Sequence, residues 1–251
     1  MSATSPPRRN FRGPLLSIYI GSDSDPFVVH KDLLSATSAL FRRYLSEDAL
    51  TLPDEDPQLF EIYAQWLYAR NSKAVLKELR AHELVPRDDD SGVSDQPGAD
   101  TLFHLFCLGE RIRDVKFKNA VIDAYIDATI KGEENPIHLA GWIYERLPEA
   151  SKFKRLYIDI WCWNSDVHWF EDLQPRDDPL TAPGAFWLDV LKKKTALGRN
   201  VYDGRLRAPW VADRGQYHEE ECEDGDDGEE LDATKDENED LEVVIKTEAD
   251  M

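Results

Sequence analysis

The side chains of this chain that could do chemistry are few and widely separated. Cys107, Cys162 and Cys222 occur without a Cys-x-x-Cys or Cys/His spacing, so we expect neither a disulfide framework nor a zinc site. The sequence contains no Gly-x-x-x-x-Gly-Lys phosphate loop, no Gly-x-Ser-x-Gly elbow and no His-Glu-x-x-His metal pair. We therefore expect no enzyme, no cofactor and no metal, with Cys107 and Cys162 packed as small hydrophobes.

Two short segments hold hydroxyl, carboxylate or imidazole groups. The segment 21–24 (Gly-Ser-Asp-Ser) resembles a hydrolase nucleophile block, but its place before Pro26 is better explained by a hairpin turn. We interpret His30 as a partly buried structural histidine, because no catalytic partner is near it in the sequence. Sequence alone cannot bring two of the many carboxylates together, so a carboxylate pair stays an open alternative.

The acidic residues gather at the C-terminus. The net charge is −20, and residues 219–251 hold seventeen Asp and Glu against two Lys. Such a segment repels itself and has little apolar surface to bury, so we expect residues 201–251 to form a disordered acidic tail, most simply a solvating one. Direct nucleic-acid binding is not expected, because affinity for phosphates depends on Lys and Arg.

One lysine of the tail stands in the context of a modification site. The segment 245–248, Ile-Lys-Thr-Glu, resembles the acceptor site for the modifier SUMO, with Lys246 as the acceptor. The preceding segment 243–245, Val-Val-Ile flanked by acid, resembles a SUMO-binding strand, which would add to a sheet edge. The alternative is a chance β-prone patch, whereas a functional site would indicate a nuclear pool.

The elements expected in the N-terminal half are short. Residues 15–20 are β-rich, residues 21–26 have turn chemistry and residues 27–29 form a second strand, which together predict a hairpin. Ser35 and Ser38 favour a helix end or a new N-cap, so two short helices are expected there. The apolar stripe of those helices has three- and four-residue steps: Leu33, Leu34, Thr37, Leu40, Phe41, Tyr44 and Leu45. Residues 49–52 predict a further strand, and Asp56 before Pro57 predicts a helix start.

The segment 27–41 has the pattern Phe-x-x-His-Lys-x-Leu-Leu-x-x-x-Ser-x-x-Phe. This pattern resembles the BTB/POZ domain, and the matching residues are Phe27, His30, Leu33, Leu34, Ser38 and Phe41. Residues 57–68 and 118–123 resemble later helices of the same family. The resemblance covers residues 15–130 and implies an α+β fold, a small β-sheet flanked by a helical cluster. Within this range, residues 82–100 are rich in charge, Gly and Pro and have no apolar period, so we expect a flexible, exposed loop there.

Three amphipathic segments follow and predict an all-helical extension over residues 131–200. Their apolar positions are Leu139, Trp142 and Ile143; Phe153, Leu156, Tyr157, Ile160 and Trp161; and Phe186, Trp187, Val190 and Leu191. A BTB domain with such an extension resembles proteins common in filamentous fungi, which carry an element like residues 143–148. We interpret Trp161, Trp163 and Trp169 as core residues rather than a binding cage, and we expect residues 1–14 to be disordered.

The resemblance implies protein assembly rather than catalysis. BTB adaptors place a hydrophobic-x-Glu tripeptide after their second main helix, where it helps to dock a cullin ubiquitin-ligase scaffold. The equivalent residues here are Leu45 and Glu47, an apolar anchor beside a carboxylate that would fix orientation at the rim. The alternative is that Leu45 continues the core stripe and Glu47 is only solvated.

The sequence contains neither an internal repeat nor a Cys/His array, so a client would bind the extension or the loops. Because residues 1–14 are short and polar, we expect any self-association to use other faces than a swapped N-terminal strand. The alternative function is a nuclear or transcriptional regulator that assembles through the BTB domain and recruits partners through its acidic tail.

No apolar run reaches the roughly 20 residues of a membrane span, and no signal-peptide pattern is present. We expect an intracellular protein, in nucleus or cytoplasm, without a membrane partner.

Overall fold

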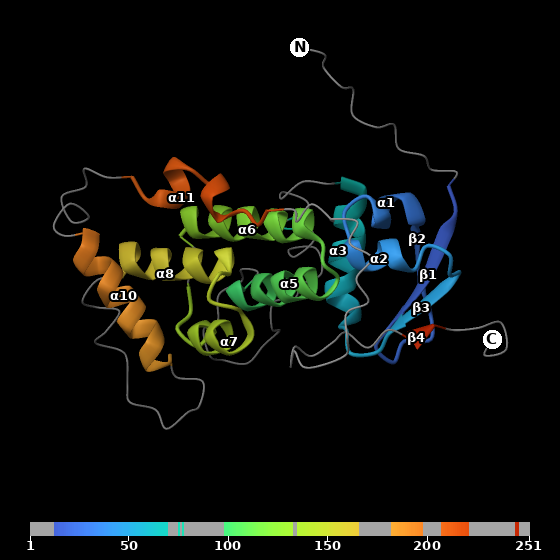
Figure 1. Cartoon of the computed structure of the whole chain (residues 1–251), viewed down its shortest axis with the longest axis horizontal. Helices are drawn as coiled ribbons and strands as arrows, with labels where there is room; N and C mark the ends of the chain where they lie inside the picture. The colour runs from blue at the N-terminus through green and yellow to red at the C-terminus, as the bar shows by residue number, and fades with distance from the viewer. Residues whose placement is uncertain are drawn as a thin grey trace, which may run out of the picture.

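A small β-sheet forms one end of an elongated molecule (Figure 1). The computed structural model describes residues 13–69, 75, 77, 98–132, 135–165, 182–197 and 207–220, and the backbone of 244–245. Strand β1 (Leu15–Ile20) lies between the antiparallel strand β2 (Phe27–His30) and the parallel strand β3 (Ala49–Leu52). A two-residue strand, β4 (Val244–Ile245), pairs antiparallel with β3. The predicted hairpin and third strand are therefore confirmed within an α+β fold.

The sheet turns one face toward the helices. Leu16, Ile18 and Ile20 alternate along β1 and are fully buried, whereas Leu15 is 48% exposed. The register sets Ile18 opposite Phe27 on one side and opposite Leu50 on the other. Residues directly opposite each other in neighbouring strands point to the same face of the sheet. Phe27 and Leu50 therefore lie with Ile18 on the face toward the core.

The helices that cover the sheet begin where the sequence predicts. Helices α1 (Lys31–Ser35) and α2 (Ala39–Arg43) are separate, because Ser38 accepts a hydrogen bond on Oγ from the Phe41 N–H and starts the second one. Helix α3 (Pro57–Ala69) follows Asp56, whose carboxylate accepts from the Gln58 N–H at 2.7 Å. Asp56 with proline at the first helical position thus forms the expected start.

Two central helices join the sheet end to the extension (Figure 1). Helix α5 (Ala99–Arg111) is buried along most of its circumference, and α6 (Val115–Ile130) lies beside it after a short turn. Gly109 marks their close approach, since a Cβ there would lie 2.7 Å from Lys118 Cγ and 3.2 Å from Phe117 Cδ1. The missing side chain of glycine therefore allows the two helices to pack at this distance.

The extension is helical, as predicted. It contains α7 (Leu139–Arg146), α8 (Lys152–Asn164) and α10 (Gly184–Leu197). Trp161 is 3% exposed and its ring meets those of Phe186 and Trp187 edge-on at 5.8 Å, which confirms its core role. Leu191 departs from the predicted stripe, because it is 60% exposed. Trp169 lies outside the described residues.

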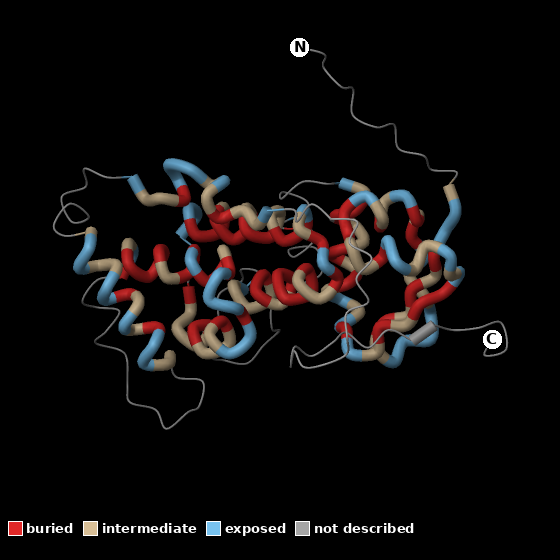
Figure 2. The backbone as a smooth tube through the Cα atoms, in the orientation of Figure 1, coloured by how far each residue is buried: buried red, intermediate tan, exposed pale blue. Residues whose placement is uncertain are grey.

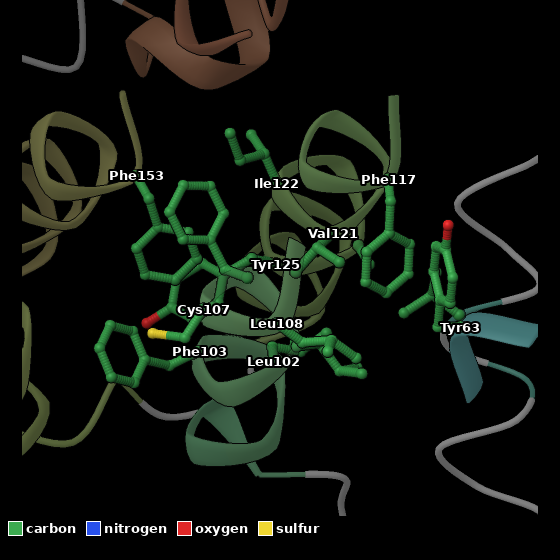
Figure 3. Packing of buried hydrophobic residues seen from close by; sticks show 14 of the residues in the cluster. Tyr63, Leu102, Phe103, Cys107, Leu108, Phe117, Val121, Ile122, Tyr125 and Phe153 are labelled. Atoms are coloured by element: carbon green, nitrogen blue, oxygen red, sulfur yellow. The ribbon is translucent and has the colours of Figure 1, made fainter. Parts of the chain in front are cut away.

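One hydrophobic core runs through the molecule. Figure 2 shows buried backbone along α5, α6 and α8 as well as in the sheet. Figure 3 shows Tyr63 of α3 against Phe117 of α6, with ring centroids 4.9 Å apart, and Phe153 of α8 near Tyr125 of α6, at 5.0 Å. Cys107 is buried in the same core, as expected. The sheet, the central helices and the extension thus share a continuous core.

The expected disordered tail over residues 201–251 is wrong for Val244–Ile245, which form β4, and for residues 207–220. This segment forms α11 (Pro209–Ala212) and a 3-10 turn, η2 (Gly215–Tyr217), which lie over α6 and α8 (Figure 1). Trp210 and Tyr217 are buried, and Tyr217 donates from its hydroxyl to Asp159 of α8 at 2.7 Å. Glu219 is held through its backbone by Asn119 of α6. Two aromatic anchors thus give this segment enough apolar surface to fold.

Two further boundaries differ from expectation. Pro14, at the end of the segment expected to be disordered, accepts a backbone hydrogen bond from Lys31 at 2.9 Å. Ala99 and Asp100, at the end of the expected loop, are already helical. Residues 1–12 and 82–97 lie outside the described residues, as do 201–206, 221–243 and 246–251.

Candidate protein-interaction site

The candidate contact lies on the turn between α2 and β3. Leu45 and Glu47 are half-buried there, and Ser46 between them is exposed. Tyr44 ends α2, and its carbonyl accepts a hydrogen bond from the Glu47 N–H at 3.2 Å. The turn is therefore closed by its own backbone, and it presents both predicted residues at the surface.

Lys31 fixes this turn from below. Its ammonium is largely buried and donates to the Leu45 carbonyl at 3.1 Å and to the Asp48 carboxylate at 3.3 Å. The Asp48 side chain is 97% exposed, so solvent screens its attraction to Lys31 and the ion pair contributes little. The bond to the Leu45 carbonyl matters more, because a buried ammonium must be hydrogen-bonded. Lys31 is thus a positioning residue for the Leu45 backbone.

The surface of this turn combines apolar and charged groups. Leu40 of α2 and Tyr44, the residue that caps its C-terminus, lie four positions apart, are half-buried and pack against the core. The Glu47 carboxylate accepts a hydrogen bond from the Ser46 hydroxyl at 3.1 Å. The arrangement can bury a partner's apolar side chain and accept hydrogen bonds from its amide or cationic groups.

The other residues of the BTB-like pattern support the fold. Leu34, Ser38 and Phe41 are buried, whereas Phe27, His30 and Leu33 are half-buried. The His30 ring Nδ1 lies 2.8 Å from the Tyr68 hydroxyl at the end of α3, and the Phe27 ring meets Phe60 edge-on at 5.1 Å. These contacts tie the hairpin to α3, so the interpretation of His30 as a structural histidine agrees with its surroundings.

Ser38 joins the sheet end to the central helices. Its hydroxyl is fully buried and donates to the Ile112 carbonyl at 2.6 Å while it also caps α2. Asp114 pairs with Ser38 in an antiparallel bridge and caps α6 by accepting from the Phe117 N–H at 2.9 Å. The Tyr63 hydroxyl donates to the second oxygen of Asp114 at 3.0 Å. Two helix caps thus support each other at one buried joint.

The described residues include two buried cysteines and several His, Asp and Glu side chains. Among them, no group of three or more His, Cys, Asp or Glu is placed to hold a metal ion. Burial raises the pKa of Cys107 to about 11 and also raises the pKa of Cys162, so both thiols are protonated near neutral pH. None of the helices in the described part of the chain is both long and apolar enough to span a membrane. Lys246 lies outside the described residues.

Sequence reasoning missed the role of Lys31 in this site. The bond from Lys31 to Leu45 joins positions 14 apart, which no helix or strand period predicts. The sequence signal that could have revealed this role is the position of Lys31 between a strand and an apolar helix, where a buried ammonium requires a hydrogen-bond acceptor. The chain matches no family model, no curated protein and no solved structure. The interpretation of the site therefore rests on its residues and geometry.

Proposed function

We propose that this chain is a non-enzymatic interaction module of BTB/POZ type, which acts as an adaptor or scaffold and docks a cullin-type ubiquitin-ligase scaffold. Two features support the proposal. The order of strands and helices, β1-β2-α1-α2-β3-α3 and then α5-α6, agrees with the fold that the sequence pattern implies. The residues of the hydrophobic-x-Glu tripeptide lie together on a surface turn.

The observation that carries the proposal is the hydrogen bond from Lys31 to the backbone of this turn. Lys31 holds the Leu45 carbonyl at 3.1 Å, so the turn is ordered before any partner arrives. A preorganised contact loses less conformational entropy on binding than a mobile one. Leu45 would be the central anchor and Glu47 the rim acceptor, because hot spots gather where a side chain is fully desolvated and charges at the rim set orientation.

The test is binding of the full chain to a cullin N-terminal domain. Truncating a central anchor costs roughly 2 kcal/mol or more, which weakens binding by about thirtyfold. The Leu45→Ala/Glu47→Ala double variant should therefore lose binding while its unfolding midpoint stays close to that of the wild type. A matched control, Leu191→Ala/Glu145→Ala, removes an exposed Leu and an exposed Glu from the far end of the molecule and should bind normally.

Three results would contradict the proposal. The wild type shows no binding, the folded double variant binds as well as the wild type, or the control loses binding to the same extent. A Lys31→Met variant refines the test, because it removes the donor to the Leu45 carbonyl but leaves Leu45 and Glu47 in place. We expect this variant to bind more weakly than wild type and more tightly than the double variant.

A further inference from the structure

Strand β3 is paired along both edges, and its second partner comes from the far C-terminal segment. On one side Leu50 lies opposite Ile18 of β1, in parallel. On the other side Leu50 lies opposite Ile245 and Thr51 opposite Val244, antiparallel. Glu220, the last described residue before β4, precedes Val244 by 24 positions. A segment remote in sequence thus completes the outer edge of the sheet (Figure 1).

The edge of β3 carries neither a charged side chain nor a proline. Its sequence is Ala-Leu-Thr-Leu, and Ala49, Leu50 and Leu52 are buried. Protected edges commonly carry a lysine, a proline or a bulge, because their outward N–H and C=O groups otherwise form a template for another strand. Without β4, the edge of β3 would be such a template.

The composition around β4 suits the position. Val243, Val244 and Ile245 form an aliphatic run in an otherwise acidic segment, and Leu241 lies two positions before it. β-branched residues favour extended backbone. Two paired residues supply few hydrogen bonds, each worth a net of about 0.5–1.5 kcal/mol, so an isolated strand of this length would bind weakly. Covalent linkage makes the pairing intramolecular, with an effective concentration on the order of millimolar.

We propose that the edge of β3 is a strand-docking site for an extended peptide with consecutive β-branched residues, and that Val244–Ile245 of the same chain is its resident occupant. The site adds a strand to a sheet through main-chain hydrogen bonds. This proposal is independent of the proposed cullin contact at Leu45, and its tests do not depend on cullin binding. Removing the occupant opens the edge to a second strand of the same kind.

Cysteine cross-linking tests the register and the origin of the occupant. In the full chain with Cys222→Ser, Thr51→Cys/Val244→Cys places two thiols on residues directly opposite each other, within disulfide range for an antiparallel pair. Mild oxidation should give a cross-linked monomer at a rate that does not depend on protein concentration. Thr51→Cys/Ala233→Cys is the control and should react at least about tenfold more slowly. Equal rates, or cross-linked dimers that increase with concentration, would overturn the proposal.

Hydrogen exchange tests whether the edge accepts a strand in trans. The full-length Val244→Pro/Ile245→Pro variant lacks the N–H donors of β4, so β4 should no longer pair with the edge of β3. The β3 amides that donate to β4 carbonyls should then exchange about tenfold faster. A peptide of residues 239–249 should restore protection, and the same peptide with both prolines should not. Unchanged exchange in the variant, or no rescue by the aliphatic peptide, would contradict the proposal. The unfolding midpoint of the variant is the control for its fold and should stay close to that of the wild type.

Discussion

The buried hydroxyl of Ser38 offers the sharpest test of how the two ends of the molecule are joined. Ser38→Ala removes one oxygen atom and leaves the backbone and the packing volume almost unchanged. That oxygen accepts from the Phe41 N–H at 3.1 Å and donates to the Ile112 carbonyl at 2.6 Å. The substitution therefore removes a helix cap and a bond between α2 and the end of α5 at the same time.

The structure allows the cost to be worked out in two parts. Loss of a serine N-cap costs about 1 kcal/mol. Loss of the donor to the Ile112 carbonyl, in a place where Ser38 is 0% exposed, costs about 1–3 kcal/mol. Ser38→Ala should therefore lower the free energy of unfolding by roughly 2–4 kcal/mol. Ser151, the N-cap of α8, is the matched control, because its hydroxyl is also buried but accepts a single, longer bond of 3.5 Å.

Urea unfolding of the two variants, followed by far-UV circular dichroism, gives both free energies. We expect Ser151→Ala to lose about 0.5–1 kcal/mol, clearly less than Ser38→Ala. The m-value should stay constant, since neither change alters the surface exposed on unfolding. A loss below about 1 kcal/mol for Ser38→Ala, or equal losses for both variants, would refute the view that Ser38 both caps α2 and bonds it to the end of α5.

Three further predictions concern the packing and charges of the central helices. Gly109→Ala should lower the free energy of unfolding by about 1–3 kcal/mol in urea titrations, because its Cβ would lie 2.7 Å from a neighbouring side-chain carbon. Arg111→Met should cost about 3 kcal/mol in the same assay, because it leaves the fully buried Glu55 carboxylate without its bidentate partner. The His138 ring donates a hydrogen bond to the Asp100 carboxylate, which raises the pKa of His138, so the stabilising contribution of this bond is fully present below about pH 6.5 and lost as pH rises through the raised pKa. In Asp100→Asn, an NMR titration should find a lower His138 pKa and thermal melts should find a flatter pH dependence of stability.

Each of these predictions has its own control. Gly184→Ala adds a Cβ with no atom within 4 Å and should change stability little, so an equal loss there would contradict the packing argument. Glu55→Gln/Arg111→Met removes both charges, and it should be more stable than Arg111→Met alone. An unchanged His138 pKa in Asp100→Asn would show that the 2.8 Å contact does not control its titration.

Local signals in the sequence predicted much of the N-terminal half. Ser38 separates two short helices because its hydroxyl satisfies an N–H that an uninterrupted helix would bond to backbone. Asp56 and Pro57 mark a helix start for the same local reason. Alternation of apolar residues identified β1, whose inward side chains are Leu16, Ile18 and Ile20. Such features depend on neighbours a few residues apart, so sequence can predict them.

Features that depend on distant contacts were missed. Residues 207–220 were placed in the acidic tail because of their neighbours' composition, yet Trp210 and Tyr217 anchor them to α6 and α8. The two aromatic side chains were the available signal. The brace from Lys31 to Leu45 and the pairing of β3 with β4 depend on tertiary structure, which a single sequence does not determine by period or propensity.

Docking of a cullin at this turn is tested most directly by a hydrogen-exchange footprint of the full chain with and without a cullin N-terminal domain. We predict protection on binding at residues 40–48, the end of α2 and the turn that Lys31 contacts, and no added protection in the Leu45→Ala/Glu47→Ala variant. Protection confined to the extension, or no protection anywhere at saturating cullin, would contradict the assignment of this turn as the docking site.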